Sequence, residues 1–452
     1  MVSFTHDGPG TAASTWAARL DAATLPALDL GDVDRVVVVA AHPDDESLGA
    51  GGLLARASAR GLESVVVVAT DGEASHPDST THTASRLAEL RRAEVERALA
   101  RLHAGARLVA LALPDGRLAD HQSALTTTLV ELIGDGRRSL VVAPWRRDGH
   151  PDHEAAGRAA AAAAVRTAAR LWEYPVWWWH WATPEDAPWS DLAVLALDAA
   201  EVAAKAAAGD AHASQVHPLS DRPGDEVLLS AEFRAHFEGD RELFVLQPAE
   251  DSALDDLHAE ADDPWGVDVD FYEERKRGLL LAALPRERFR HGLEVGSSTG
   301  ALAADLAARC DALLVVDASA HAVAAAQRRC AGLPGVRVEQ RRVPAAWPQA
   351  PAGGFDLVVL SEVGYFLSPR DLDELLARIG ESLAEDGVLV LCDWQHEVQG
   401  WPLDGVAVHR VVRAAGIRPV VATYADRDVE LLVLAHPEVL PEPQADDGSH
   451  DG

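Results

Sequence analysis

Apolar and polar positions alternate in blocks along the first half of the chain. Four short apolar runs are bounded by polar residues or breakers, at 36–39, 65–70, 108–113 and 140–143. Short apolar runs rich in β-branched residues predict buried parallel strands. Apolar residues recur at helical spacing in three further stretches, 86–102, 125–133 and 153–170. This alternation predicts a parallel sheet with helices on both faces.

The second half repeats this pattern. A helical stretch at 272–284 precedes five apolar runs, at 293–295, 313–316, 336–338, 357–360 and 388–391. A length of 452 residues also fits about two domains. The predicted fold is therefore α/β, with two doubly wound, mainly parallel, Rossmann-like domains in tandem.

An acidic stretch separates the two halves. No Lys or Arg occurs from 250 to 274, acidic residues recur through it, and Pro264 and Gly266 interrupt any regular element. A like-charged stretch with breakers is typical of a linker. We predict four segments: a first domain over 1–250, an acidic linker over 251–263, a second domain over 264–440 and a disordered polar tail over 441–452.

Two polar clusters follow predicted strands of the first half. They are His42-Pro43-Asp44-Asp45-Glu46 and His150-Pro151-Asp152-His153. Open α/β sheets bind ligands at the C-terminal ends of their strands, so we expect the clusters to meet there. Each motif alone could instead be a capped loop before a helix. Two histidines and a carboxylate suit Zn²⁺ in an open catalytic site, and the set also admits Fe²⁺ or another divalent ion.

These clusters hold more polar groups than metal ligation needs. A bound ion lowers the pKa of water to ~7 and polarises a carbonyl oxygen. A neighbouring carboxylate can then take the proton of the water, and a nearby imidazole can stabilise the oxyanion. Hydrolysis of an amide is the chemistry that this set of residues predicts.

Composition indicates which classes of binding partner and which cellular compartment to expect. The net charge of -32 argues against a nucleic-acid partner. No apolar run approaches ~20 residues, so no integral membrane segment is expected. The three cysteines, Cys310, Cys330 and Cys392, are odd in number and form no Cys-x-x-Cys pair, which favours a reducing compartment. With no signal peptide at the N-terminus, we expect a cytoplasmic protein, whose oligomeric state is left open.

The paired clusters resemble those of the LmbE-like (PIG-L) family of zinc-dependent N-acetylglucosaminyl deacetylases, over roughly residues 34 to 245. The resemblance implies that three residues bind the metal, namely His42, Asp45 and His153. It also implies that Asp44 is the general base and that His150 steadies the tetrahedral oxyanion.

The same resemblance implies substrate contacts. The family has an Arg in the helix after the second strand and an Asp in a Pro-Asp-Gly turn; Arg86 and Asp115 match them and would hold sugar hydroxyls. A surface salt bridge to Glu89 is the alternative for Arg86. Histidines outside the clusters, His212 among them, are interpreted as packed or solvated. The aromatic run at 177–181 is either a packed edge or a stacking surface for sugar rings.

A second ligand-binding turn opens the second half. A strand runs into Glu294, Gly296, Ser298 and Gly300 before a helix, and Asp317 ends the next strand. Glycines let a ligand approach the helix N-terminus, and the acidic residue can hold ribose hydroxyls. Spacing alone admits a nicotinamide cofactor or S-adenosylmethionine. The Glu before the first glycine and the lack of G-x-G-x-x-G favour the second, and the turn resembles class I methyltransferases with Ser298 at the usual middle glycine.

A finer resemblance is to NodS-like methyltransferases, over roughly residues 260 to 435. Three motifs carry it: Asp263-Pro264-Trp265-Gly266, Tyr272-Glu273-Glu274-Arg275-Lys276 and Ser361-Glu362-Val363-Gly364-Tyr365. Such enzymes N-methylate the free amine of a glucosamine in a chitin-type oligosaccharide. The resemblance implies that Tyr272 and Arg275 close over the cofactor and that Glu362 faces the acceptor amine. The alternative for Glu362 is a carboxylate at a helix N-terminus.

The two halves together predict a bifunctional enzyme that acts on an amino sugar or glycoconjugate. Its first domain removes an N-acetyl group with a divalent metal, and its second methylates the exposed amine with S-adenosylmethionine. Two alternatives stay open. The domains could act on different parts of a glycosylated secondary metabolite, or the chain could be a scaffold whose sites have decayed.

Overall fold

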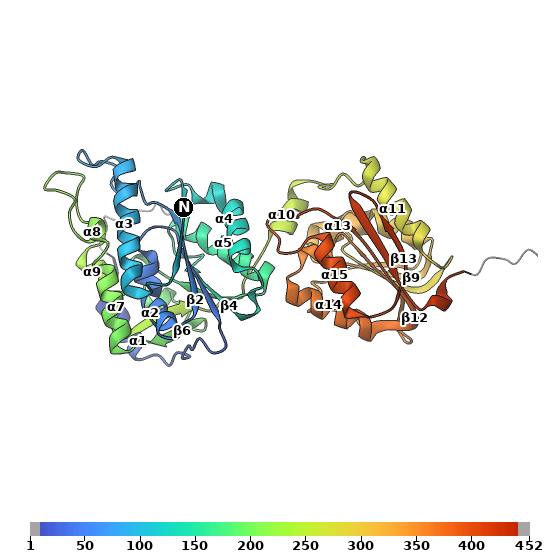
Figure 1. The fold of residues 1–452 in the computed structure, drawn as a ribbon, viewed down its shortest axis with the longest axis horizontal. Coiled ribbons are helices and arrows are strands. Elements are labelled where there is room, and N and C mark those ends of the chain that lie inside the picture. The colour runs from blue at the N-terminus through green and yellow to red at the C-terminus, as the bar shows by residue number, and fades with distance from the viewer. Residues whose placement is uncertain (1–9, 442–452) are drawn as a thin grey trace, which may run out of the picture. The chain divides into compact units, whose positions relative to one another are not determined.

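The computed structural model describes residues 10–441 and consists of two compact units, Met1–Asp251 and Ser252–Gly452 (Figure 1). Each unit contains one seven-stranded sheet. Of the predicted disordered tail, 441–452, all but the first residue lies outside the described residues.

The sheet of the first unit has the strand order β3-β2-β1-β4-β5-β7-β6. Its strands are β1 Arg35–Ala40, β2 Glu63–Thr70, β3 Arg107–Leu113, β4 Ser139–Pro144, β5 Arg170–Tyr174, β6 Leu192–Ala196 and β7 Arg241–Val245. The first five strands are parallel, and β7 runs antiparallel to both β5 and β6. The predicted doubly wound, mainly parallel sheet is confirmed.

Helices cover both faces of this sheet (Figure 1). They are α1 Ala13–Asp21, α2 Asp45–Ala59, α3 Ala84–Leu102, α4 Gln122–Ile133, α5 Pro151–Thr167, α6 Trp178–Trp181, α7 Ala199–Gly209, α8 Ala213–Val216 and α9 Ala231–Arg234. Alternate residues of β1 point to opposite faces. Val38 packs in one core cluster with Leu53 and Leu99 of α2 and α3, whereas Val39 packs in another with Leu129 of α4. Because both faces are buried, β1 is apolar at successive positions.

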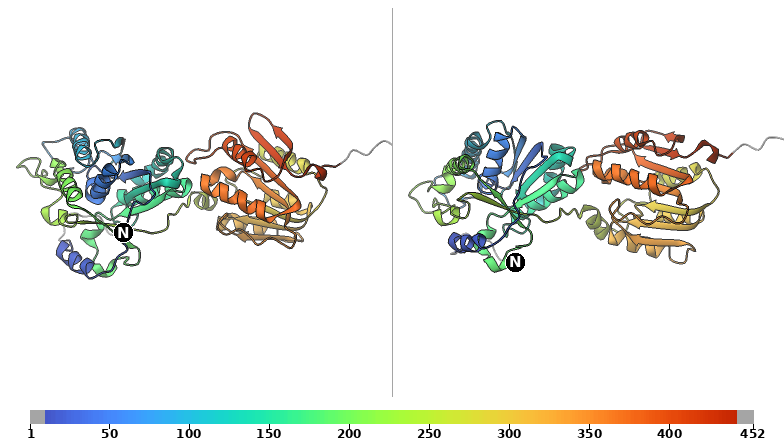
Figure 2. Two further views of the ribbon diagram at one scale, coloured as in Figure 1. Left: turned by 60° about the horizontal axis from the view of Figure 1, so that its bottom comes forward. Right: turned by 90° about the horizontal axis from the view of Figure 1, so that it is seen from below.

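The second unit repeats the same strand order, here β10-β9-β8-β11-β12-β14-β13. Its strands are β8 Phe289–Val295, β9 Cys310–Asp317, β10 Val336–Gln340, β11 Phe355–Ser361, β12 Leu383–Trp394, β13 Val420–Ala425 and β14 Val429–Leu434. Its helices are α10 Ala253–Glu260, α11 Phe271–Ala283, α12 Ala301–Ala307, α13 Ala320–Arg329, α14 Pro369–Ser382 and α15 Gly405–Ala415. The views of Figure 2 show helices on both faces of this sheet as well.

Both sheets reverse their strand order at an equivalent place. The reversal lies between β1 and β4 in the first unit and between β8 and β11 in the second. At such a reversal, neighbouring connections leave toward opposite faces and open a crevice at the C-terminal ends of the strands, where α/β proteins bind ligands. The predicted metal cluster follows β1 and β4, and the predicted cofactor turn follows β8.

The predicted acidic linker lies almost wholly within the second unit, which begins at Ser252, and it is more ordered than a plain linker. Residues 253–260 of the predicted linker form α10, and Asp255 of this helix accepts a hydrogen bond from Ser319 Oγ at 2.6 Å. A run of like charges therefore becomes helical here because it packs against the second unit. Within residues 10–441, no helix is both long and apolar enough to cross a bilayer.

Candidate metal centre and cofactor site

The three predicted metal ligands come together where β1 and β4 end. His42 Nδ1 lies 3.2 Å from His153 Nε2, and Asp45 places Oδ1 3.3 Å from His153 Nε2 and Oδ2 3.8 Å from His42 Nδ1. Ligand atoms bound at 2.0–2.1 Å to a tetrahedral zinc ion lie about 3.3 Å apart, so the spacing of the two imidazole nitrogens fits one divalent ion, whereas Asp45 reaches these nitrogens with two different oxygens. The donor atoms of His42, His150 and His153 also lie within 4.8 Å of one another.

The tautomer of His153 is fixed by a residue that the sequence analysis missed. His153 Nδ1 donates to Asp148 Oδ2 at 2.8 Å, which leaves Nε2 as the ligand atom. Asp148 is fully buried and also accepts three backbone N–H groups, those of residues 176–178, at 2.7, 3.1 and 3.0 Å. Asp148 stands two positions before His150 and five before His153, but nothing in the local pattern marks it, because the three backbone donors that orient it come from a segment almost thirty residues later.

Replacing Asp148 by Asn should weaken metal binding 10–100-fold, because one amide cannot both fix the His153 tautomer and serve the other donors. The measurement is a titration of metal-free protein with Zn²⁺. Asp225→Asn is the matched control, since Asp225 is fully buried in the same unit but bonds the hydroxyls of Ser79, Thr81 and Ser220. Unchanged metal affinity with a lower melting temperature would restrict Asp148 to a folding role.

His42 is oriented by two carboxylates. Its Nε2 lies 3.1 Å from Asp115 Oδ1 and 3.3 Å from Asp152 Oδ2, so Nδ1 is left to face Asp45 and His153. Burial opposes a positive charge on this ring, but Asp115 and Asp152 outweigh burial and raise the pKa of His42 to about 10. Asp115, predicted to hold sugar hydroxyls, therefore contacts a metal ligand directly.

His150 is placed to donate a hydrogen bond into the site. Its Nδ1 accepts the backbone N–H of Asp152 at 3.2 Å, which assigns the ring proton of the neutral form to Nε2. Burial and the neighbouring His153 and His42 rings lower the pKa of His150, so the ring is neutral at physiological pH. A neutral imidazole with its proton on Nε2 suits the predicted contact with an oxyanion.

Asp44 is held in an unusual backbone conformation beside the metal ligands. Its φ is +132°, a region that residues other than glycine rarely adopt. Glu46 Oε2 accepts the N–H of Asp44 at 3.1 Å, and Arg91 Nη2 donates to Asp44 Oδ2 at 3.0 Å. Burial raises the pKa of Asp44 to about 6, against the lowering effect of Arg91. A carboxylate with this pKa can accept a proton near neutral pH.

Glu46 is itself fixed by a buried histidine. His212 Nε2 lies 3.2 Å from Glu46 Oε1 and 2.9 Å from Ser47 Oγ, and Ser47 Oγ donates to Glu46 Oε1 at 2.6 Å. The sequence predicts a packed or solvated histidine at His212; in the structure it is buried and belongs to the group of side chains that supports Asp44. The sequence gives no sign of this role because His212 lies 165 positions from Ser47.

The structure corrects the predicted Arg contact. Arg86 is exposed and pairs with Glu89 at 3.1 Å, which matches the surface salt bridge given as its alternative. Arg91 is buried and donates to Pro43 O at 2.7 Å and to Gly72 O at 2.8 Å, in addition to Asp44. Five residues along a helix turn the side chain by about 140°, so only one of these two arginines can face the site.

Arg91→Lys should lower kcat/KM for amide hydrolysis by at least roughly tenfold, because a lysine cannot donate to three fixed acceptors at once. Arg86→Lys should remain within about twofold of the parent, as expected for an exposed ion pair. Acetate release is the measurement for both proteins. The reverse order of effects would return the substrate contact to Arg86.

The aromatic run 177–181 is mainly packing. Trp177, Trp178 and Trp179 are all buried, and Trp16 Nε1 donates to Trp179 O at 2.9 Å. Trp181 Nε1 donates to the backbone carbonyl of Asp148 at 2.9 Å. Of the two interpretations given for this run, the structure favours a packed edge that braces the metal centre over a stacking surface.

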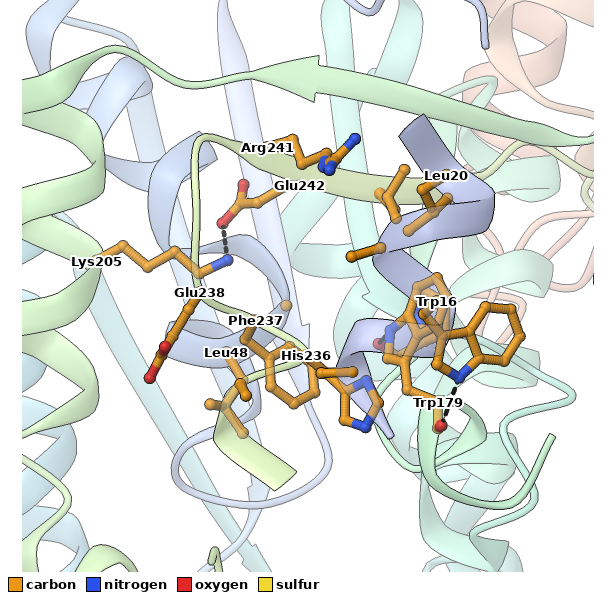
Figure 3. Close-up of a pocket in the computed structure, with 16 residues that line it drawn as sticks. Trp16, Leu20, Leu48, Trp179, Lys205, His236, Phe237, Glu238, Arg241 and Glu242 are labelled. Atoms are coloured by element: carbon orange, nitrogen blue, oxygen red, sulfur yellow. Dashed lines mark hydrogen bonds and ion pairs between the residues drawn. The ribbon is translucent and has the colours of Figure 1, made fainter. Parts of the chain in front are cut away.

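A recess of about 620 Å³, counting space open to solvent, lies elsewhere in the first unit (Figure 3). Trp16 and Trp179 line one side, and an ion pair between Lys205 Nζ and Glu242 Oε1, 2.9 Å apart, lines another. Glu242 also accepts two backbone N–H groups of α2, at 2.7 and 2.9 Å, just after the non-helical Ala50. These charges therefore support the kink in α2, and none of the predicted metal ligands lines the recess.

The cofactor turn of the second unit needs its glycines. Gly296 has φ of +80° and Gly300 has φ of +79°. A Cβ on Gly296 would overlap the side chain of Val363, and one on Gly300 would lie 2.8 Å from Ala326 Cα. Ser298 also has a positive φ, +44°, where the family pattern has glycine. The turn is thus built for close approach of a ligand to the backbone.

Polar atoms around this turn fit a nucleoside ligand. Asp317 ends β9 and accepts the N–H of Ser298 at 3.0 Å and that of Ser319 at 2.9 Å. Glu294 Oε2, Ser298 Oγ and Thr299 Oγ1 are buried without a hydrogen-bond partner among the described residues. Burial raises the pKa of Glu294, with Asp317 adding to it. Buried polar atoms without partners are uncommon, and the hydroxyls and amines of a nucleoside would satisfy them.

In helix α11, Lys276 and not the predicted Arg275 faces the candidate cofactor site. Arg275 donates to Asp426 at 2.8 Å and to Tyr424, at the β13–β14 hairpin. Its neighbour Lys276, about 100° further around the helix, is buried and lies 3.2 Å from Glu362 Oε1. Tyr272 Oη is buried without a partner among the described residues, so Tyr272 remains a candidate for the predicted cofactor contact and Arg275 does not.

Comparisons with known proteins address the two units separately. The family model of GlcNAc-PI de-N-acetylase (PIG-L) matches residues 37–164, and that of nodulation protein S (NodS) matches residues 247–409.

Among curated relatives, the chain is 32% identical over 167 residues to a 1D-myo-inositol 2-acetamido-2-deoxy-α-D-glucopyranoside deacetylase of Nocardia farcinica, covering 32% of this chain and 56% of that one. It is 32% identical over 129 residues to a diacetylchitobiose deacetylase of Thermococcus kodakarensis, covering 28% and 47%. The chain thus spans about half the length of these relatives.

A crystal structure of the N-methyltransferase NodS from Bradyrhizobium japonicum with S-adenosyl-L-homocysteine is also similar. Identity is 23%, the match covers 41% of this chain and 97% of that one, and the TM-score is 0.36. Because the two family models match different parts of the chain, the chain is a fusion of two enzyme domains. It joins a PIG-L, or LmbE-like, deacetylase domain to a NodS-like methyltransferase domain, as the paired motifs predict.

Proposed function

We propose that the first domain hydrolyses the N-acetyl amide of an amino sugar and that the second methylates the amine so exposed. The observation that carries this proposal is that both sheet reversals hold a nearly complete set of groups. One has His42, Asp45 and His153 in contact at 3.2–3.8 Å beside Asp44, and the other has a glycine turn beside Glu362. Both relatives reported above for the first domain are named as deacetylases of acetamido sugars, and NodS is named as an N-methyltransferase.

The residues at the first reversal fit a divalent ion held by His42, Asp45 and His153. Such an ion supplies Lewis-acid polarisation of the amide carbonyl and makes a nearby water more acidic. Asp44 accepts the proton of the attacking water and can return it to the departing amine. His150 Nε2–H donates to the oxygen that gains negative charge.

The residues at the second reversal fit S-adenosylmethionine. When bound, this cofactor supplies an activated methyl group. The glycines of the turn at 296–300 let the cofactor approach the backbone closely. The carboxylate of Asp317 can accept hydrogen bonds from the ribose hydroxyls. Transfer to an amine requires a nitrogen that is already deprotonated, and it requires alignment, which the chain provides by holding both reactants at one crevice.

The test uses the full-length protein with diacetylchitobiose, Zn²⁺ and S-adenosylmethionine carrying a labelled methyl group. We expect acetate release, followed by label on the same sugar. After metal removal, label should no longer enter the acetylated sugar but should still enter its deacetylated form. Label on the acetylated sugar without acetate release contradicts the coupling, and no label on any amine contradicts the second activity. Absence of bound metal and of hydrolysis would indicate a decayed site.

A further inference from the structure

Helix α2 consists of two segments that meet at Ala50. The φ of Ala50 is -139° and its ψ is 16°, outside the helical region, so residues 45–49 and 51–59 form separate helical segments. Asp45, a predicted metal ligand, is the first residue of the first segment. Because this segment is short, its direction decides where the Asp45 carboxylate lies relative to the other predicted ligands.

The two segments are supported by different parts of the sheet. Tyr174 of β5 supports the first segment, because a Cβ on Gly49 would overlap the Tyr174 ring. Tyr174 Oη in turn donates to Val39 O of β1 at 2.6 Å. Leu197, directly after β6, supports the second segment, where a Cβ on Gly52 would lie 2.5 Å from its side chain. The glycines thus let each segment approach its own support closely.

Glu242 of β7 caps the second segment. Its carboxylate accepts the N–H groups of Gly52 and Leu53 at 2.7 and 2.9 Å, and Lys205 Nζ lies 2.9 Å from the same carboxylate (Figure 3). In an unbroken α-helix, these two N–H groups would instead donate to carbonyls four residues earlier, in the first segment. Glu242 therefore stabilises the broken form of α2 against a straight form.

The recess of Figure 3 lies beside this break. Its lining includes Leu48 and Gly49 of the first segment as well as Lys205 and Glu242. Most of a protein interior is packed so closely that one group moves only if its neighbours move too. On the side of the recess, the first segment faces open space, so it can turn there without displacing a packed side chain.

We propose that Glu242, with Lys205 as its counter-charge, is a positioning residue of the metal centre. The capped break keeps the first segment turned so that Asp45 lies beside the two predicted histidine ligands. Without the cap, α2 straightens and Asp45 moves away from them. The proposal rests on the metal centre of the proposed function. It adds two residues that are distant from the predicted ligands in sequence, in a recess that none of those ligands lines.

The test removes the cap and its counter-charge together, in the double variant Glu242→Leu/Lys205→Met. Either change alone would leave one buried charge unpaired. Metal-free, full-length protein is titrated with Zn²⁺, and the visible absorption spectrum is recorded with Co²⁺ in place of Zn²⁺. We expect the affinity for Zn²⁺ to fall by at least about tenfold. The Co²⁺ bands should shift as well, because they report the geometry of the ligands.

Arg56→Met/Glu201→Leu is the matched control. Arg56 also lies in the second segment, and its Nε donates to Glu201 Oε1 of α7 at 2.7 Å, but this ion pair does not contact the break. Both double variants should have a lower melting temperature than the parent. The control should keep the Zn²⁺ affinity within about twofold and the Co²⁺ spectrum unchanged, since distant sites act independently.

The inference is overturned if Glu242→Leu/Lys205→Met lowers only the melting temperature and keeps the affinity and the spectrum of the parent. If that variant does not fold, Glu242→Asp is compared with Glu201→Asp. A shorter carboxylate keeps the charge of each pair but cannot reach the same N–H groups, so only Glu242→Asp should weaken Zn²⁺ binding. A parent that binds Zn²⁺ but releases no acetate from diacetylchitobiose would contradict the proposed hydrolysis alone.

Discussion

Asp44→Asn should lower the rate of acetate release by roughly 10²–10⁴-fold while leaving the metal in place. Asparagine has nearly the same size and can still accept the hydrogen bond from Arg91, which is 3.0 Å long in the native site. It cannot, however, take a proton from water. The predicted ligands are His42, Asp45 and His153, which lie 3.2–3.8 Å from one another, so the metal content should not change.

The measurement pairs kcat for acetate release with elemental analysis of the same sample. Asp120→Asn is a suitable control, because Asp120 is exposed and its only polar contact described is with Arg117. Loss of metal in Asp44→Asn would make Asp44 a ligand. An unchanged rate would remove Asp44 as the base and point to another group beside the metal.

Gly296→Val should abolish binding of S-adenosylmethionine, with affinity weakened by more than about 100-fold. The backbone of Gly296 lies at a φ of +80°, which disfavours any β-branched residue, and the added side chain would collide with Val363. Val363 follows Glu362 at the same sheet reversal, so the collision falls within the crevice. Calorimetric titration of the full-length variant with S-adenosylmethionine measures the effect.

Gly332→Val is the control for Gly296→Val, because it introduces the same backbone strain without blocking the crevice. Gly332 has φ of +85°, but nothing lies within 4 Å of an added Cβ. This variant should lose stability yet keep cofactor affinity, and both variants should keep acetate release because each unit has its own core clusters. Cofactor affinity at the parent level in Gly296→Val would place the cofactor away from this turn.

Much of this protein is determined by local sequence. The alternation of apolar runs and helical stretches is enough to predict that both sheets are mainly parallel, because a strand buried on both faces must be apolar at successive positions. The sequence also predicts that the clusters holding His42, Asp45 and His153 meet, because each cluster follows the end of a strand and parallel strands bring those ends to one edge; the prediction that these three residues bind the metal comes from the resemblance to the LmbE-like family. The glycine turn could be assigned for the same reason.

Only the tertiary structure decided which side chains support these groups. Arg91 rather than Arg86, and Lys276 rather than Arg275, face their sites because the phase of a helix relative to its sheet depends on packing along its whole length. Asp148 is anchored by backbone groups that begin 28 positions later, although its contact with His153 spans only five, and His212 contacts Ser47, 165 positions away. Contacts over such separations leave no local pattern in the chain, since they form only when the core positions the segments side by side.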